Sequence, residues 1–538
     1  MTATTEARET GARPAEPAGS GFGAVLRVQL RTGWKAPVIW VLALVGGYAA
    51  TVAALDTTYG TPEQLATYEQ TVGSDPAMAA INGTPYGADT LGGVAANEFG
   101  FIAAIAIPLM GLFLVARQTR APEESGLLEL LRSRGVGRRA PWTAAVVVTV
   151  VALALVGTGM ALVLIAYGEP ADAAWLYGAS IATLGGVFAG LATFVGQLVR
   201  RAAGVTAVGI IVLGGAYLTR AIGDVRDNAW KWLSPLAWQQ ETRPFADDSR
   251  VWPLLLALAV VIVLVVAGLV LVGSRDLGSA MVASRPGPRR ASRFGASTLG
   301  LALRAHAPAG LGWIAGAAVV GVVFGAFTDD IADAVAANPA LAGMFGADAA
   351  DQVNESYAGF TLLLIAFMAM GCLAQSMLRL HGEETGGRLE PTLARASHRV
   401  GWMTTHAVTA AVFACIALLV GGAGLAWTAG DRVDGVLAAT AAYLPAVLVI
   451  GGLGMLLFGL VPGWSSLIWL VLAYAVFADL LGSTLSLPDW ALALSPTHVV
   501  GDVPVDDVDA AAELWLSVVA LGTAAVGAIG FRLRDVPR

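Results

Sequence analysis

Long runs without Asp, Glu, Lys or Arg alternate with shorter polar segments along most of the chain. A helix that crosses a ~30 Å hydrocarbon core needs about 20 apolar residues. Eleven runs are near or above this length: 36–55, 99–116, 140–168, 173–199, 202–219, 251–274, 309–328, 356–378, 400–430, 435–478 and 514–531. The run at 435–478 is too long for one crossing and contains Pro462-Gly463, which is a turn signal. We therefore predict an all-α polytopic membrane protein with twelve transmembrane helices.

Basic residues lie mainly on one side of these predicted spans. Of the 32 Lys and Arg residues, 26 fall in segments 1–35, 117–139, 200–201, 275–304, 379–399 and 532–538. On the other side, three long segments carry no basic residue: 56–98, 328–356 and 482–513. Only 220–250 and Arg432 break the pattern. Because cytoplasmic loops are enriched in Lys and Arg, we expect both termini in the cytoplasm and the protein in the plasma or inner membrane.

Polar positions in the loops repeat along the chain. Segments 120–139 and 380–399 can be aligned so that Glu123-Glu124 match Glu383-Glu384. After a one-residue gap, an offset of 261 relates Glu129, Arg134 and Arg138 to Glu390, Arg395 and Arg399, and Ser234-Pro235 to Ser495-Pro496. The repeat predicts a disordered tail (1–20), a first six-span half (21–273), a cytoplasmic linker (274–298) and a second half (299–538). Both halves would enter the membrane the same way round, so their symmetry axis would lie along the membrane normal.

Shorter amphipathic segments flank the spans. Val25–Arg31 and Leu299–His306 are apolar and basic, which predicts helices lying on the inner leaflet. The outer segments 62–90 and 329–352 are too long for tight turns. Leu65, Tyr68 and Val72 have helical spacing, so short outer helices and plain surface loops are both open for these segments.

The composition excludes several classes of protein. Hydrophobic residues make up 56% of the chain and charged residues 13%, whereas a soluble domain has about 25% charged residues. Two cysteines in apolar runs and five scattered histidines support neither a disulfide framework nor a metal site. The only lysines, Lys35 and Lys231, each follow Trp, so neither belongs to a phosphate-binding P-loop. We expect a non-enzyme that binds no cofactor or nucleic acid, driven by a partner ATPase or an ion gradient.

Two acidic loops connect the chain to a known family. Each reads Glu-Glu-(Ser/Thr)-Gly, then Leu-Glu two or three residues later, then a basic run that opens the next span. This pattern resembles the first cytoplasmic loop of ABC type-2 permeases. Nearly the whole chain, including Leu-Ser-Pro at 233–235 and 494–496, resembles the double-length actinobacterial polyketide-antibiotic or tetronasin exporters, in which two permease halves are fused.

The resemblance implies a role for both loops. In that family the loop is a coupling helix that sits in a groove of a separate ATPase subunit. Two copies of a cytoplasmic ABC ATPase, carrying ATP and Mg²⁺, would then be partners, together with membrane lipids and a hydrophobic small-molecule substrate. The matching residues are Glu123, Glu124, Gly126, Leu128, Glu129, Glu383, Glu384, Gly386, Leu389 and Glu390. Charges in one such loop could simply solvate it, but a matched second copy favours docking.

The two copies of the loop are not identical. Pro391 replaces the Leu expected after Glu390, which predicts a weaker second docking surface. Removing all four residues of Glu123-Glu124 and Glu383-Glu384 is expected to uncouple transport from ATP hydrolysis while leaving membrane insertion intact.

Candidate cargo-contacting residues follow from the same resemblance, because spans 2 and 5 of each half line the path in that family. Here these spans contribute Phe101, Met110, Tyr217, Phe360, Phe367, Met368, Met370, Tyr474 and Phe477. Ordinary helix packing or lipid contact is the alternative for each. Four charged residues near the predicted outer face form either a polar gate or interfacial contacts with water and headgroups: Glu98, Arg220, Glu355 and Asp479.

The resulting functional hypothesis is export by alternating access. The cargo would be a hydrophobic or amphipathic compound such as an antibiotic, a drug or a lipid-like molecule. A lipid or glycolipid exporter of the same ABC class remains open. So does a gradient-driven 6+6 carrier, for which Asp479 is the one thin candidate relay. An intramembrane enzyme would need convergent catalytic groups at depth, and a sensor a sizeable soluble domain; the sequence indicates neither.

Overall fold

The computed structural model describes residues 21–71, 81–282, 292–329, 352–394, 398–481 and 487–535, with Ala79, Arg290 and Ala332. These residues form helices and irregular segments and contain no strand. Twelve of the described helices are long and apolar enough to cross a membrane. The prediction of an all-α polytopic fold is confirmed. The long run at 435–478 divides as expected, into α19 (Val436–Leu460), the 3₁₀ helix η5 (Pro462–Leu467) and α20 (Ile468–Leu481).

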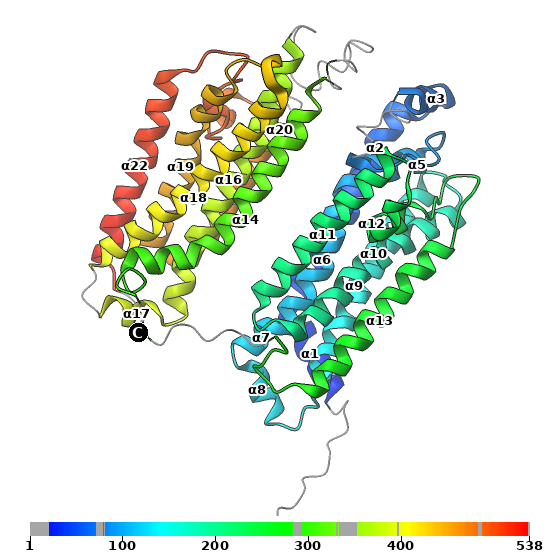
Figure 1. Ribbon diagram of the computed structural model, residues 1–538, viewed down its shortest axis with the longest axis horizontal. Helices are drawn as coiled ribbons and strands as arrows, with labels where there is room; N and C mark the ends of the chain where they lie inside the picture. Colours follow the sequence, from blue (N-terminus) through cyan, green and yellow to red (C-terminus); the bar gives the residue numbers. More distant parts are fainter. Residues whose placement is uncertain are drawn as a thin grey trace, which may run out of the picture. The chain divides into compact units, whose positions relative to one another are not determined.

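The chain forms two compact units, residues 1–286 and 287–538, and each contains six of the twelve spans (Figure 1). The spans of unit 1 are α2 (Lys35–Tyr59), α6 (Gly100–Gln118), which α7 (Arg120–Glu124) continues, α9 (Ala140–Ala166), α10 (Ala171–Leu198), α11 (Ala202–Val225) and α13 (Trp252–Ser274). Its shorter elements are α1 (Phe22–Gly33), α3 (Pro62–Thr71), α5 (Leu91–Glu98), α8 (Leu127–Arg132), η1 (Ala229–Leu233) and α12 (Pro235–Gln240).

Unit 2 repeats this order of spans. They are α14 (Thr298–Ala326), α16 (Val353–Thr385), α18 (Arg399–Ala429), α19, α20 with η5, and α22 (Ala510–Leu533). Its shorter elements are α17 (Leu389–Leu393), η4 (Gly430–Arg432), α21 (Asp489–Leu492) and η6 (His498–Val500). The tail 1–20, most of segment 329–352 and part of the linker lie outside the described residues, so the predictions for them stay predictions.

Glycines let the helices approach closely inside each unit. A Cβ atom added at Gly157 would clash with the carbonyl oxygen of Gly178, and one at Gly178 would clash with that of Gly157, at the contact of α9 with α10. In unit 2, Gly321 of α14 meets the backbone of Gly421 of α18 in the same way. Small residues at helix contacts allow close van der Waals packing where lipid provides no hydrophobic drive. These contacts hold the spans of each unit in fixed register.

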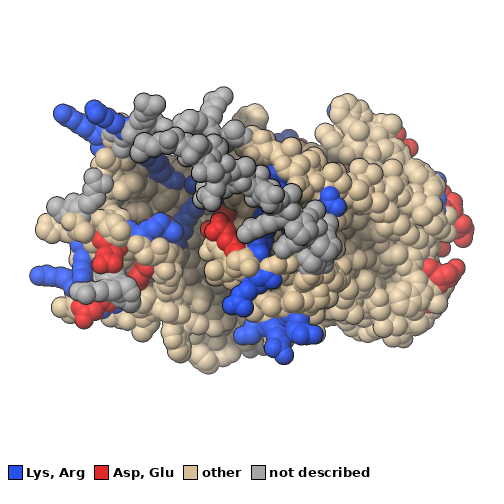
Figure 2. Space-filling model, turned by 90° about the horizontal axis from the view of Figure 1, so that it is seen from below, with Lys and Arg blue, Asp and Glu red and all other residues tan. Residues whose placement is uncertain are grey.

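Each unit has two unlike ends. At the first, α6 leads into α7 and α8, which we call elbow 1 (residues 119–133), and α16 leads into α17, which we call elbow 2 (residues 380–394). We call this the elbow end of each unit, and the other end the opposite end. The surface seen from below in Figure 2 carries many Lys and Arg side chains. This distribution agrees with the basic segments from which we predict a cytoplasmic location.

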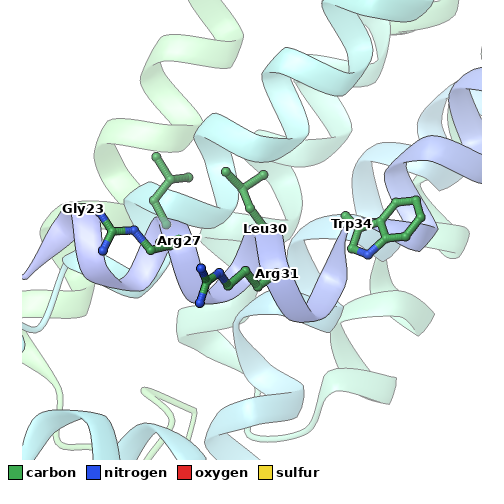
Figure 3. A pocket seen from close by; sticks show the side chains of 6 residues that line it. Gly23, Arg27, Leu30, Arg31 and Trp34 are labelled. Atoms are coloured by element: carbon green, nitrogen blue, oxygen red, sulfur yellow. The ribbon is translucent and has the colours of Figure 1, made fainter.

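The amphipathic segments before the first span of each half take different forms. In unit 1, Val25 of α1 is buried against Val136 and Ala140, and the Gln29 side chain donates to the Gln118 and Pro141 carbonyls at 3.3 and 3.1 Å. The rest of α1 borders a shallow hollow of about 610 Å³. The residues that line this hollow include Arg27, Leu30, Arg31 and Trp34 (Figure 3). In unit 2 the corresponding segment has no break and belongs to α14, which contains Pro308.

Segment 62–90, one of the two predicted outer segments, contains a helix rather than only a loop. Leu65 and Tyr68 lie on α3, and the buried Tyr68 hydroxyl donates to Glu98 Oε1 at 2.7 Å and also lies 3.0 Å from Asn97 Oδ1. Of the two alternatives for this segment, the short helix is the one observed.

Candidate functional site

The two elbows turn at matched glycines. Gly126 lies between α7 and α8 with φ of 77°, and Gly387 lies before α17 with φ of 66°. This left-handed conformation favours glycine, because a Cβ atom is strained there. The two glycines are 261 residues apart, like Glu129 and Glu390, so one offset relates the entire elbows and the one-residue gap in our sequence alignment is wrong. Gly387, rather than Gly386, corresponds to Gly126.

With this register, Glu123 corresponds to Glu384, and the two share one role. The Glu123 carboxylate is buried and forms a two-pronged ion pair with Arg275, the residue after α13. Arg275 Nη1 donates to Oε1 at 2.6 Å, and Nη2 donates to Oε2 at 2.8 Å. We call this ion pair lock 1. It joins the elbow to the end of the last span of unit 1.

Further groups of unit 1 complete lock 1. Arg120 Nη1 lies 3.0 Å from Glu123 Oε2, and the Gly278 amide donates to Oε1 at 2.8 Å. Arg275 Nε donates to Gln197 Oε1 at 2.7 Å, near the end of α10. Both guanidinium groups also lie over the ring of Trp142, at 5.9 and 5.7 Å. Two buried arginines thus share one buried carboxylate, which gives each of them an ionic partner away from water.

Unit 2 contains the same ion pair with other neighbours. Arg534, the residue after α22, donates through Nη1 and Nη2 to the two carboxylate oxygens of the buried Glu384 at 2.6 and 2.8 Å, which we call lock 2. Its guanidinium lies over the rings of Phe458 and Phe531 at 5.2 and 5.4 Å. Phe458 is the residue 261 positions after Gln197. A cation–π contact therefore replaces the hydrogen bond that Gln197 makes in unit 1.

The exposed faces of the elbows differ. In elbow 1, Leu127 and Leu130 are 47% and 69% exposed, and Glu124 and Glu129 are exposed beside them. Their counterparts in elbow 2, at offset 261, are Arg388 and Pro391 for the two leucines, and Thr385 and Glu390 for the acids; all four are exposed. Elbow 1 thus presents an apolar ridge, whereas elbow 2 presents a polar surface.

Arg388 is engaged within its own elbow. Its Nε donates to Glu383 Oε2 at 2.8 Å, and this hydrogen bond raises the pKa of the Arg388 guanidinium. The Glu124 carboxylate of elbow 1 instead accepts the backbone N–H of Ala202, the first residue of α11.

The ten residues assigned to coupling from the sequence therefore fall into two groups. Glu123, Glu384, Leu128 and Leu389 are buried inside their units. The idea that Glu123 offers its carboxylate to a partner protein is wrong for this conformation, because Arg275 and Arg120 already hold it. The residues that remain accessible on the elbows are Glu124, Gly126, Glu129, Glu383, Gly386 and Glu390.

The predicted path residues also divide by burial. Met110, Phe367 and Met370 pack in the cores of their own units, so in this conformation they line no surface. Phe101 and Phe477 are exposed. The half-buried ones are Tyr217, Phe360, Met368 and Tyr474. The Tyr217 ring contacts the Phe101 ring edge-on, with a centroid distance of 6.2 Å. The Tyr474 hydroxyl donates to the Ala491 carbonyl at 2.7 Å.

The predicted gate residues each have partners within their own unit or stand at its opposite end. Glu98 accepts from Tyr68. Arg220 is buried, donates to the Ile81 carbonyl at 2.9 Å and lies over the Tyr217 ring at 4.5 Å. In unit 2, Asp479 accepts from Ser495 at 2.9 Å and from Thr497, and Glu355 is half-buried near the start of α16.

Unit 1 also has a charged cluster at its opposite end that sequence reasoning missed. The buried carboxylate of Glu241 lies 2.7 Å from Lys231 Nζ and 2.8 Å from Arg243 Nη2, and accepts from Tyr86 at 2.8 Å. Burial alone would raise the pKa of Glu241, but the hydrogen bonds from Lys231 and Tyr86 and the nearby positive charges hold it below its usual value. These contacts engage Lys231 and Arg243, two of the five basic residues of 220–250 that break the charge pattern.

An apolar hollow of about 360 Å³ lies between α10, α11 and α13 of unit 1. Phe188, Val212 and Leu264 are among the side chains that line it. Its volume is within the usual range for pockets that hold small molecules, and its lining suits an apolar group.

The arginines of the locks were also missed, although the sequence carries a signal for them. An Arg-Asp pair follows the last apolar run of each half, at 275–276 and 534–535. Both arginines directly follow the last helix of their half, and both pair with the acidic residue that the repeat places in the elbow.

Twelve candidate spans in two like units with matched elbows define a polytopic membrane protein of two similar halves. The second half, residues 296–532, matches the family model of the multidrug efflux system permease Rv1217c, C-terminal domain. The whole chain is 34% identical, over 553 aligned positions covering 99% of each protein, to the multidrug efflux system permease protein Rv1217c of Mycobacterium tuberculosis. The chain thus belongs to the ABC type-2 efflux permease family.

Proposed function

We propose that this chain is the membrane subunit of an ATP-driven exporter in the plasma or inner membrane, with both termini in the cytoplasm. A separate cytoplasmic ABC ATPase subunit would dock at each elbow, and the two copies would carry the ATP and Mg²⁺. The observation that carries the proposal is the pair of elbows that turn at matched glycines, in a chain that matches a multidrug efflux system permease over its full length.

The exposed part of elbow 1 suits such a docking surface. Leu127 and Leu130 form an apolar ridge, and Glu124 and Glu129 lie next to it. Apolar side chains that enter a partner's groove dominate binding energy, while carboxylates around them pair well with Arg on the partner. Closure of the two ATPase subunits on ATP would push the elbows and turn the halves from inward-open to outward-open.

The proposed cargo is a hydrophobic or amphipathic compound. The relative's name specifies multidrug efflux, and the apolar hollow beside α11 offers a surface for an apolar group. Among the predicted path residues, Phe101 and Phe477 are those whose exposure allows direct contact with a cargo. Lipids and glycolipids are the other cargo class that this chemistry accommodates.

The test is reconstitution of the chain with its ATPase in proteoliposomes. We expect ATP-dependent transport of amphipathic dyes and cargo-stimulated ATP hydrolysis. Glu124→Ala/Leu130→Ala should weaken both without loss of protein from the membrane. This pair replaces the removal of Glu123-Glu124 and Glu383-Glu384, because two of those four carboxylates are buried in the locks and their loss would damage folding. Transport that follows an ion gradient and ignores ATP would refute the proposal.

A further inference from the structure

Each lock joins three parts of its unit at the elbow end. In unit 1, lock 1 connects the elbow, through Glu123, with the end of α10, through Gln197, and with the end of α13, through Arg275. In unit 2, lock 2 connects Glu384 with Arg534 after α22, against Phe458 of α19.

In both units a further hydrogen bond joins the segment after the elbow to the end of the last span. Arg138 donates to the Gly273 carbonyl at 3.2 Å, and Arg399 donates to the Arg534 carbonyl at 2.9 Å. Both donors and both acceptors are 261 residues apart. The elbow segment is thus tied twice to the end of the last span, in the same way in each half.

The ion pair is kept while its surroundings change. Gln197 of unit 1 is replaced by Phe458, and Arg120 by His381 at the same offset. Stability alone does not require this, because a buried ion pair can be replaced by apolar side chains of similar volume with little loss. What a two-pronged arginine–carboxylate pair adds is a fixed distance and orientation between the two segments that carry it.

From this we infer that Glu123–Arg275 and Glu384–Arg534 are positioning pairs that make the last span of each half move as one body with its elbow. The inference rests on the proposed function, in which the ATPase acts on the elbows. Leu127, on the exposed ridge, begins α8 directly after the Gly126 turn, and α7 with Glu123 ends just before that turn, so a displacement of the ridge reaches the lock through this short turn.

In unit 1 the lock also holds the start of the linker. The Gly278 amide donates to Glu123, and the Ser279 carbonyl accepts from Arg120 at 3.2 Å and from Arg275 at 3.1 Å. The Met281 amide donates to the Gln197 carbonyl at 3.1 Å. Displacement of elbow 1 therefore moves the segment that leads to the second half as well.

Lock 2 allows the sharper test, because Glu384 balances one arginine rather than two. In the reconstituted complex with its ATPase, the quantity measured is the number of dye molecules transported per ATP hydrolysed. Glu384→Gln and Arg534→Gln should each lower this ratio about fivefold or more. The double variant should be no worse than either single one, and Glu384→Asp should recover part of the loss. Asp535→Asn is the matched control, since it removes an exposed charge beside the lock. An unchanged ratio in both single variants overturns the inference.

A distance measurement tests the same inference in protein with intact locks. In a Cys372→Ala/Cys415→Ala background, spin labels at the exposed positions Ser133 of elbow 1 and Val270 of α13 report the separation of the two elements. We expect the same distance distribution without nucleotide and with ATP trapped. A nucleotide-dependent change in this distance overturns the inference.

The variant Leu130→Glu separates failure of this inference from failure of the proposed function. It changes the exposed ridge and leaves lock 1 intact. If this variant uncouples hydrolysis from transport but the lock variants do not, only the inference fails. If Leu130→Glu leaves ATPase binding and coupling unchanged, docking at elbow 1 is refuted as well.

Discussion

Elbow 1 and elbow 2 are alike inside and unlike outside. Both turn at a glycine of positive φ and bury a glutamate paired with the arginine that follows the last span. On the surface, Leu127 and Leu130 of elbow 1 correspond to Arg388 and Pro391 of elbow 2. The two elbows therefore share the ion pair between the buried glutamate and its arginine, although their exposed faces differ in sequence. The comparison separates what links an elbow to its own spans from what it presents to a partner.

The opposite ends of the units diverge more completely. Unit 1 gathers Lys231, Arg243 and Arg250 around the buried Glu241. The residue at the corresponding offset in unit 2, Asp502, is exposed, and the polar cluster there consists of Asp479 with Ser495 and Thr497. The two units therefore resemble each other most closely at their elbow ends.

The largest expected effect comes from removing the acid of lock 1. Glu123→Leu leaves Arg120 and Arg275 buried without their carboxylate, so we expect a loss of about 3–5 kcal/mol in the free energy of unfolding. Glu384→Leu should cost less, because it strands only Arg534. Thermal unfolding of the detergent-solubilised protein, followed by tryptophan fluorescence, measures both. Glu384→Leu/Arg534→Met should return close to the wild type. Equal losses from the two single variants would contradict the asymmetry between the locks.

A smaller loss is expected at the opposite end of unit 1. Glu241→Gln removes the carboxylate that three basic side chains share, which should cost about 2 kcal/mol. Because its partners hold the pKa of Glu241 below its usual value, the stabilisation is present above pH ~4.3 and is lost as pH falls through the folded-state pKa. The difference in unfolding temperature between wild type and variant should therefore close in acid. Asp502→Asn in unit 2 serves as the control and should change stability by less than about 0.5 kcal/mol. A difference that does not narrow as the pH is lowered would count against this assignment.

The exposed faces should differ in their affinity for the ATPase. Leu130→Glu in elbow 1 is expected to weaken binding about tenfold, which corresponds to about 1.4 kcal/mol. The matched change Pro391→Glu in elbow 2 should weaken it less than about twofold. Titration of the purified ATPase against nanodisc-embedded protein measures both affinities. Equal effects at the two elbows would show that the faces are functionally equivalent despite their chemistry.

The smallest expected effect is a gain. Arg388→Leu/Pro391→Leu gives elbow 2 the ridge of elbow 1 and should tighten ATPase binding by about two- to fivefold. The change also removes the Glu383–Arg388 pair, but such an exposed pair contributes only about 0–1 kcal/mol. The same titration detects the change. Weaker binding of the double variant would indicate that the partner recognises Arg388 itself.

Much of the fold was predictable because lipid imposes a strong constraint on the sequence. A segment inside a bilayer must satisfy its backbone hydrogen bonds internally, so every span appears as a long apolar run, and Pro462-Gly463 marks the one hairpin hidden within such a run. The repeat was also visible in the loops. What failed was its register, because Glu383 and Glu384 are adjacent and identical. Only Arg534, some 150 residues later, determines which of them is buried.

The sequence predicted where along the chain the candidate site lies. It did not predict which side chains of the site are buried and which are exposed. Helix number alone suggested that Met110 and Met370 line a path, yet both point into their own cores. Tertiary packing decides which residues of a membrane helix face the protein core. Because almost every residue of such a helix is apolar, its sequence carries little periodicity from which that face can be predicted. Glu241 illustrates the same limit, because its basic partners are brought together by the turns between α11 and α13.

The path of residues 275–282 has a genetic consequence. Because this segment closes against elbow 1 and the end of α10, a polypeptide ending just after Val282 would include every group of lock 1. One beginning near Ser292 would include every group of lock 2. A gene split between these points would thus encode two self-sufficient halves, and fusion or fission of such genes would leave the buried chemistry of each half unaltered.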